Sequence, residues 1–108
     1  MIIYVDLDEV LCHVPGDISQ PRDYNQAVPD EYMIAKVNEL SEQGHEIVIW
    51  TARGKLTKID WKEITEKQLK DWEVKYDKLS FDKPYYDLLI DDKAVNLEYL
   101  KLDSGTSL

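Results

Sequence analysis

The sequence predicts an α/β fold in which short buried strands alternate with amphipathic helices around a mostly parallel sheet. Short apolar, β-branched runs at 2–5 and 46–50 indicate two strands. Between them, apolar residues recur at three- and four-residue steps from about 30 to 43, which is typical of a helix with one buried face. Right-handed crossovers between parallel strands favour a three-layer, Rossmann-like domain, with helices on both faces of the central sheet.

The first half of the chain divides into strand, loop, helix and strand. The first strand is followed by a long polar segment at 13–29, which holds three of the four prolines and has no apolar period. The helix that follows ends near Gln43, because Gly44 suits a left-handed cap. The second strand, at 46–50, ends at Thr51.

The second half continues the alternation. A helix is predicted from about Asp60 to Trp72, a short strand within 76–81, a stronger strand at 86–90 and a short helix at 94–100. Residues 103–108 have the composition of a flexible tail, so residues 1–102 are expected to form a single domain.

Composition limits the function. The chain has 108 residues, with 13 basic and 22 acidic side chains and a net charge of −9. This charge disfavours nucleic acid and anionic membranes as partners. The single cysteine excludes an intrachain disulfide, and no apolar run has the length of a membrane span or the form of a signal peptide. A cytoplasmic protein is therefore expected.

Carboxylates follow two of the predicted strands. Asp6 and Asp8 come at the end of the first strand, and Asp91 and Asp92 follow the strand at 86–90. Because the carboxyl ends of parallel strands meet at one edge of a sheet, these four side chains are expected to lie together. Close carboxylates repel each other unless a cation neutralises them, and oxygen ligands of this kind suit Mg²⁺.

A hydroxyl and an ammonium group complete the expected site. Thr51 ends its own strand and offers a hydroxyl and nearby N–H donors, and Lys83 precedes the strand at 86–90. Lys78 is a weaker candidate for the same positive charge. Carboxylate, divalent cation, hydroxyl and ammonium are together the parts required for phosphoryl transfer.

The chain resembles the haloacid dehalogenase (HAD) superfamily in four short motifs that occur in the same order. The motifs are DLDEVL at 6–11, IWTAR at 49–53, KP at 83–84 and IDD at 90–92. The resemblance covers about residues 1–97, and the spacing is most similar to that of small phosphatases from bacterial capsule and surface-polysaccharide gene clusters. Many members have glycine after the second aspartate, whereas this chain has Glu9.

The resemblance implies a phosphatase mechanism on the two N-terminal aspartates. Asp6 is implied as the nucleophile that forms an aspartyl-phosphate, and Asp8 as the general acid and base. Mg²⁺ is implied between Asp6, the backbone carbonyl of Asp8 and Asp91, with Asp92 acting through water.

The same resemblance implies the substrate-binding residues. Thr51 and Lys83 are expected to hold the phosphoryl group, with Ala52 and Arg53 beside them. For Arg53 two interpretations stay open. It binds a substrate phosphate or sugar acid, or it forms a structural ion pair with a nearby aspartate (Asp60 or Asp82).

Neither interval between the motifs has room for a separate cap domain, so residues 9–28 are expected to form a small flap at most. Capless members of the superfamily take bulky substrates or close the site with a neighbouring subunit, which makes a homo-oligomer an expected partner state. The expected substrate is a phosphorylated small metabolite, with a sugar phosphate first. Two alternatives are a phospho-accepting receiver-like domain, disfavoured by the order of the motifs, and a non-catalytic metal-binding module.

Overall fold

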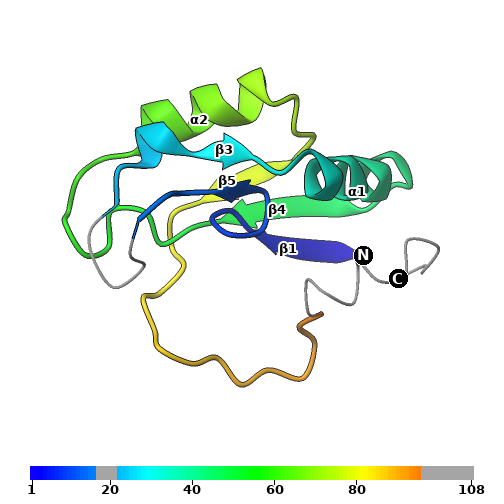
Figure 1. Ribbon diagram of the computed structural model, residues 1–108. Coiled ribbons are helices and arrows are strands. Elements are labelled where there is room, and N and C mark those ends of the chain that lie inside the picture. Colours follow the sequence, from blue (N-terminus) through cyan, green and yellow to red (C-terminus); the bar gives the residue numbers. More distant parts are fainter. Residues whose placement is uncertain (17–21, 96–108) are drawn as a thin grey trace.

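The computed structural model describes residues 1–16 and 22–95 (Figure 1). In chain order the elements are β1 (Ile2–Asp6), β2 (Cys12–His13), the 3-10 turn η1 (Tyr24–Gln26), β3 (Val28–Pro29), α1 (Glu31–Glu42), β4 (Glu46–Trp50), α2 (Lys62–Asp71) and β5 (Lys78–Ser80). The structure thus confirms an α/β fold with a parallel sheet.

The parallel sheet has the strand order β1-β4-β5. In its register, Asp6 pairs with Trp50 and Trp50 pairs with Ser80. The Thr51 N–H extends this alignment by donating to the carbonyl of Ser80 at 2.9 Å. The carboxyl ends of all three strands therefore lie level at one edge of the sheet.

Both helices pack against the same face of the sheet. Val5, Ile47 and Ile49 form one core cluster with Met33 of α1 and Leu69 of α2. The described part of the chain therefore has two layers, and the predicted third layer is wrong for these residues. The cause is the strand order: two right-handed crossovers that step in the same direction place both helices on one side.

β1 is correspondingly less buried than its apolar sequence predicts. It is an edge strand in the described sheet, and Ile2 and Tyr4 on its open face are 67% and 59% exposed. The ring of Tyr4 packs edge-on against that of Trp50, with centroids 5.3 Å apart. Only Val5 in this strand is buried, so the prediction of burial on both faces is wrong.

The helix boundaries follow their local signals. The side chain of Asp30 caps α1 by accepting the N–H of Met33 at 3.0 Å, and Gly44 adopts φ +94° beyond its end. The start of α2 differs from its predicted start at Asp60: the N-cap is Trp61, which makes no side-chain cap hydrogen bond, and Asp60 precedes it and accepts the N–H of Lys62 at 2.9 Å. Neither helix of the described residues has the length and apolar character to cross a membrane.

Residues 81–95, called here the 81–95 segment, contain no helix or strand and lead away from the sheet (Figure 1). The predicted strand at 86–90 is therefore wrong, and Leu88 and Ile90 are 77% and 89% exposed. Parallel strands need a connection of about a dozen residues or more, whereas only residues 81–85 separate β5 from this run. Most of the predicted helix at 94–100, and the predicted tail at 103–108, lie outside the described residues.

Candidate functional site

A pocket of about 590 Å³ opens at the carboxyl ends of β1 and β4, which is a volume typical of small-molecule sites. The loop after β4, the chain before η1 and the start of the 81–95 segment complete its wall. The ionisable residues that line it are Asp6, Asp8, Glu9, Arg22, Asp23, Tyr24, Arg53, Lys83, Tyr85 and Tyr86.

Asp6 and Lys83 meet in this pocket. Asp6 is the last residue of β1, and its Oδ2 accepts a hydrogen bond from Lys83 Nζ at 2.6 Å across 77 residues of sequence. The Lys83 ammonium also lies 5.9 Å from the ring centroid of Trp50 and 5.3 Å from that of Tyr86. The predicted convergence of these two groups is confirmed. Lys78, the weaker candidate, lies 3.9 Å from Glu46 and outside the pocket lining.

Burial and the ion pair act in opposite directions on Asp6. Burial raises the pKa of the Asp6 carboxyl above its ordinary value, and the hydrogen bond and charge of Lys83 oppose this without cancelling it. Burial also acts to lower the pKa of Lys83, but the contacts with Asp6 and Tyr86 together outweigh it and leave that pKa raised. Lys83 therefore remains an ammonium group and carries most of the electrostatic support for an ionised Asp6.

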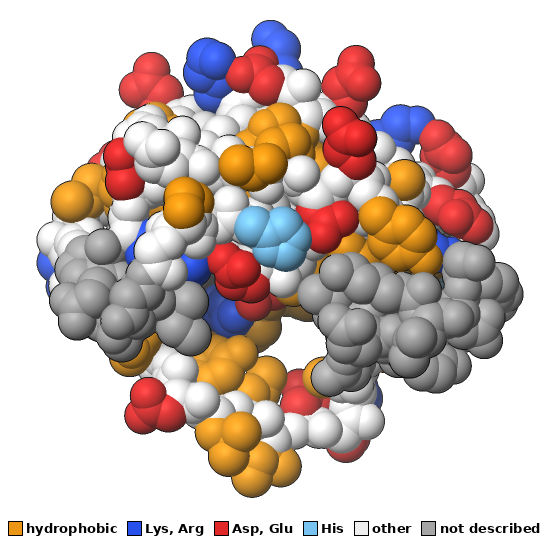
Figure 2. All heavy atoms as spheres, viewed as in Figure 1, with side chains coloured by type: hydrophobic (Ala, Val, Ile, Leu, Met, Phe, Trp, Pro, Cys, Tyr) orange, Lys and Arg blue, Asp and Glu red, His pale blue; other side chains and the backbone are white. Residues whose placement is uncertain are grey.

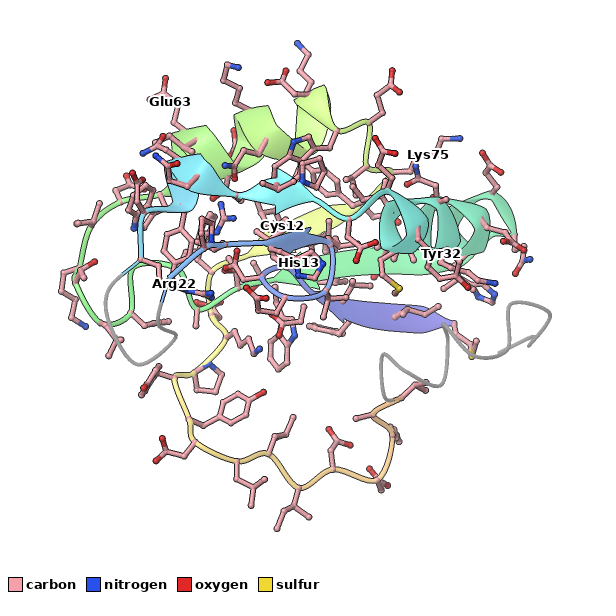
Figure 3. All side chains as sticks on the ribbon, viewed as in Figure 1. Cys12, His13, Arg22, Tyr32, Glu63 and Lys75 are labelled. Atoms are coloured by element: carbon pink, nitrogen blue, oxygen red, sulfur yellow. The ribbon has the colours of Figure 1, made fainter. Side chains whose placement is uncertain are left out.

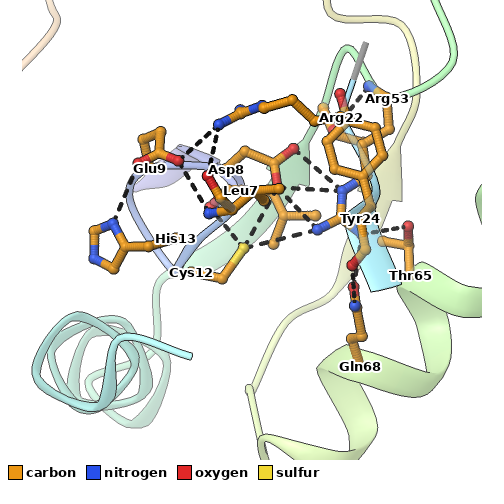
Figure 4. Close-up of polar contacts among 12 residues, drawn as sticks. Leu7, Asp8, Glu9, Cys12, His13, Arg22, Tyr24, Arg53, Thr65 and Gln68 are labelled. Carbon is orange, nitrogen blue, oxygen red and sulfur yellow. Dashed lines mark hydrogen bonds and ion pairs between the residues drawn. The ribbon is translucent and has the colours of Figure 1, made fainter. Parts of the chain in front are cut away.

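Asp8 is held by Arg53 (Figure 4). Asp8 Oδ1 accepts hydrogen bonds from Arg53 Nη2 at 2.8 Å and Nε at 3.2 Å, and Oδ2 accepts from Nε at 3.1 Å. The remaining guanidinium nitrogen, Nη1, donates to Thr65 Oγ1 at 2.9 Å and to Gln68 Oε1 at 2.6 Å, both on α2. The side chain of Arg53 is fully buried, so it fixes the orientation of the Asp8 carboxylate.

This network decides between the two interpretations of Arg53. Its guanidinium is already bonded on every nitrogen, so the expected contact with a substrate phosphate or sugar acid is wrong in this structure. Arg53 does form a structural ion pair, as the second interpretation states. Its partner, however, is Asp8 and neither Asp60 nor Asp82.

Thr51 has a different environment from the one predicted. Its side chain is 1% exposed, is not part of the pocket lining, and accepts the N–H of Arg53 on Oγ1 at 3.1 Å. The hydroxyl thus shapes the turn after β4, and the described geometry does not present it to a ligand. Ala52 and Gly54 do line the pocket. At Gly54, with φ +85°, a Cβ would lie 2.4 Å from the carbonyl oxygen of Ile59, so only glycine fits.

A polar cluster around Glu9 holds the chain that follows Asp8. Glu9 adopts a left-handed φ of 67°, and its Oε1 accepts the N–H of Val14 at 3.1 Å and Arg22 Nη1 at 3.0 Å. Its Oε2 lies 3.3 Å from the ring of His13, whose other nitrogen lies 2.9 Å from Asp30. These contacts offset the strain of a non-glycine residue in this conformation.

The cluster also shifts two pKa values. Burial acts to raise the pKa of Glu9, but the Val14 N–H, Arg22 and His13 outweigh it, so that the pKa is lowered. The hydrogen bonds to Asp30 and Glu9 raise the pKa of His13.

The sequence patterns indicate no role at this site for four of the lining residues, Glu9, Arg22, Tyr24 and Trp61. Figure 3 shows Arg22 on the pocket side of the molecule, away from Tyr32 on α1. The ring of Tyr24 lies beneath the Arg53 guanidinium at 4.6 Å and packs edge-on against Trp61 at 5.0 Å. For Arg22 and Tyr24 the signal in the sequence is the polar composition of 13–29, which indicates a functional loop but selects none of its residues. Glu9 and Trp61 lie outside that segment.

Cys12 is not a nucleophile candidate in this structure. The thiol is buried, 3.4 Å from Asp8 Oδ1, and burial together with the Asp8 charge raises its pKa to about 12. A protonated, enclosed thiol of this kind is unreactive.

Asp91 and Asp92 are not brought to the pocket. Both are exposed on the 81–95 segment, and the Asp91 carboxylate accepts the N–H of Lys93 at 2.7 Å. The expected convergence of this doublet with Asp6 is therefore wrong in this structure, because the segment forms no strand beside β1. Within residues 1–16 and 22–95, no three or more His, Cys, Asp or Glu residues gather closely enough to form a complete metal cage.

No protein-family model and no curated protein matches the chain. One solved structure is similar: a crystal structure from Vibrio cholerae that is described only as an MCSG target. It is 27% identical, with a TM-score of 0.77, and the match covers 100% of this chain and 91% of that one. The similarity supports the α/β fold, and the description of that protein names no activity.

Proposed function

We propose that this protein is a HAD-like, magnesium-dependent phosphatase that hydrolyses a phosphomonoester through an aspartyl-phosphate on Asp6. The observation that carries the proposal is the 2.6 Å contact between Asp6 and Lys83 in a pocket that also holds Asp8. A carboxylate nucleophile, an ammonium group and a second carboxylate at one strand edge are the protein groups that phosphoryl transfer needs. The order of the four motifs supports the same proposal.

The donor set of the described pocket fits a magnesium ion that shares its ligands with substrate and water. Mg²⁺ is typically bound by one or two carboxylates and by phosphate oxygens, so it does not need a cage of three protein carboxylates. Asp6 is 36% exposed on its side chain and points into the pocket, and Asp8 follows two residues later. Asp6 and the backbone carbonyl of Asp8 would hold the ion, and water and substrate oxygens would supply its other ligands. When bound, the ion would neutralise charge on the phosphoryl oxygens.

The residues of the chain have distinct parts in the proposed reaction. Asp6 attacks phosphorus and the bond to the alcohol oxygen breaks. Asp8 enters this step as the protonated acid and gives its proton to that oxygen. Asp8 then removes a proton from water, and the water attacks the aspartyl-phosphate, releasing phosphate and restoring Asp6. Lys83 has three N–H donors, so it can bond a phosphoryl oxygen and Asp6 together. Arg53 keeps the Asp8 carboxylate in one orientation throughout.

The test is phosphate release from a panel of phosphorylated metabolites, sugar phosphates first, with and without Mg²⁺. We expect Asp6→Asn to lower kcat by about a thousandfold or more, because it removes the nucleophile. The matched control is Asp71→Asn, which makes the same change at an exposed carboxylate of α2, outside the pocket. Equal release by wild type and Asp6→Asn would overturn the proposal.

Two other outcomes identify the alternatives. A stable phosphorylated protein without turnover would favour the receiver-like domain. Binding of Mg²⁺ with neither phosphoprotein nor released phosphate would favour a non-catalytic metal-binding module.

A further inference from the structure

The pocket has an ionised inner part and an apolar outer part. The inner part contains Asp6, Asp8 and the fully buried Arg53 side chain. The outer part is formed by side chains that stay largely exposed, among them Ile59 at 53% and Tyr85 at 55%. In Figure 2, hydrophobic side chains also gather along the 81–95 segment, where an opening separates it from the body of the domain.

Every cation among the described lining residues is paired with a carboxylate of the same pocket. The pairs are Arg22–Glu9 at 3.0 Å, Arg53–Asp8 at 2.8 Å and Lys83–Asp6 at 2.6 Å. Asp23 adds a fourth carboxylate and accepts hydrogen bonds from Asn25. Among the described lining residues, therefore, none offers an unpaired positive charge to a second anionic group of a substrate.

The outer part instead offers aromatic and aliphatic surface. One side of the Tyr24 ring is covered by Arg53, and its neighbour Trp61 meets it edge-on with an interplanar angle of 85°. Trp61 and Tyr85 come from two different parts of the chain, the start of α2 and the start of the 81–95 segment, and Leu56 and Ile59 also line the pocket. Rings bind such surfaces well, because planar apolar faces gain both burial and favourable ring–ring contact.

We infer that the pocket selects phosphomonoesters in which the alcohol part is uncharged and carries a ring that packs against Trp61 and Tyr85. The inference rests on the proposed function, since it names the substrate class of that same site. A carboxylate or second phosphate on the alcohol part would enter a region where carboxylates outnumber cations among the described lining residues, and it would find no unpaired cation. A short acyclic alcohol would leave the aromatic wall uncovered.

The experiment compares three monoesters of primary alcohols with the wild-type protein and Mg²⁺: benzyl phosphate, butyl phosphate and 4-carboxybenzyl phosphate. We expect kcat/KM for benzyl phosphate to exceed both others by about fivefold to tenfold, in line with the strength of ring contacts. Equal values for benzyl and butyl phosphate, or a preference for the carboxylated ester, would overturn the inference while phosphatase activity itself persists. Loss of all Asp6-dependent phosphate release would instead overturn the proposed function, and the inference with it.

The variants Trp61→Leu and Tyr85→Ala test the assigned wall. Each is expected to narrow the benzyl-to-butyl ratio of kcat/KM by about threefold or more, because each removes one ring contact. The control is Tyr32→Ala, which removes a tyrosine ring from α1 outside the pocket and is expected to leave the ratio unchanged. A ratio that all three variants leave unchanged would overturn the placement of the ring.

Discussion

The floor of the pocket, formed by Asp6, Asp8 and Arg53, and the 81–95 segment both contain aspartates but are held very differently. In the floor, strand pairing fixes Asp6, and the buried Arg53 joins Asp8 to α2 through Thr65. In the 81–95 segment, only the first residues are anchored, through Lys83, and Leu88 and Ile90 remain exposed. An apolar run therefore forms a strand only where other side chains and strands pack against it. Composition alone is not enough, because backbone and side-chain entropy oppose ordering unless buried contacts compensate.

The largest effect on stability is expected where the pocket floor is cross-linked. Arg53→Met should lower the free energy of unfolding by about 3–5 kcal/mol, because it leaves the Asp8 carboxylate without its buried partner. Urea unfolding measures this, with Lys67→Met as the control. The exposed pair of Lys67 with Asp71 should contribute about 1 kcal/mol or less. If both variants lose the same free energy of unfolding, the buried Arg53–Asp8 pair stabilises the fold no more than the exposed Lys67–Asp71 pair.

Lys83 connects the two regions, so its removal should affect both catalysis and its pH dependence. We expect Lys83→Met to lower kcat/KM by about a hundredfold through loss of charge stabilisation. Lys83 opposes the raised pKa of Asp6, so without it that pKa rises further. The nucleophile is then ionised only at higher pH, and the acidic limb of the kcat/KM profile should move upward. If the acidic limb of the kcat/KM profile does not move, Lys83 does not influence the ionisation of Asp6.

Asp91 tests whether the 81–95 segment reaches the pocket during turnover. Because the Asp91 carboxylate lies outside the pocket, Asp91→Ala should leave the Mg²⁺ concentration for half-maximal activity unchanged. Asp87→Ala changes an exposed aspartate of the same segment and should leave this concentration unchanged. A rise of about tenfold in Asp91→Ala but not in Asp87→Ala would mean that the 81–95 segment supplies a ligand during turnover.

The smallest effect is expected at the exposed end of the segment. In the absence of Mg²⁺ and substrate, Ile90→Ser should change the free energy of unfolding by less than about 0.5 kcal/mol, since the side chain is 89% exposed. Chemical denaturation of the two proteins side by side provides the measurement. A loss above about 1.5 kcal/mol would mean that Ile90 is packed in solution and that the contrast between the two regions is smaller than described.

Local pattern was sufficient to locate β1, β4 and α1. The strands were predicted from continuous apolar, β-branched runs at 2–5 and 46–50, and the helix after Asp30 was predicted from apolar periodicity. The meeting of Asp6 with Lys83 was also predictable, because the carboxyl ends of parallel strands share an edge. The absence of a strand at 86–90 was not predictable from the apolar pattern. The pattern is the same whether or not the preceding connection is long enough to bring these residues to the sheet.

The sequence by itself determined the α/β alternation, the edge where the polar groups gather and the residue types available there. Only the tertiary structure decided that Arg53 binds Asp8, that Thr51 faces inward, and that both helices share one face of the sheet. The physical reason is the range of the interactions. Periodicity and capping act between residues a few positions apart, whereas the partner of a buried charge is decided by which side chains converge after the chain has folded.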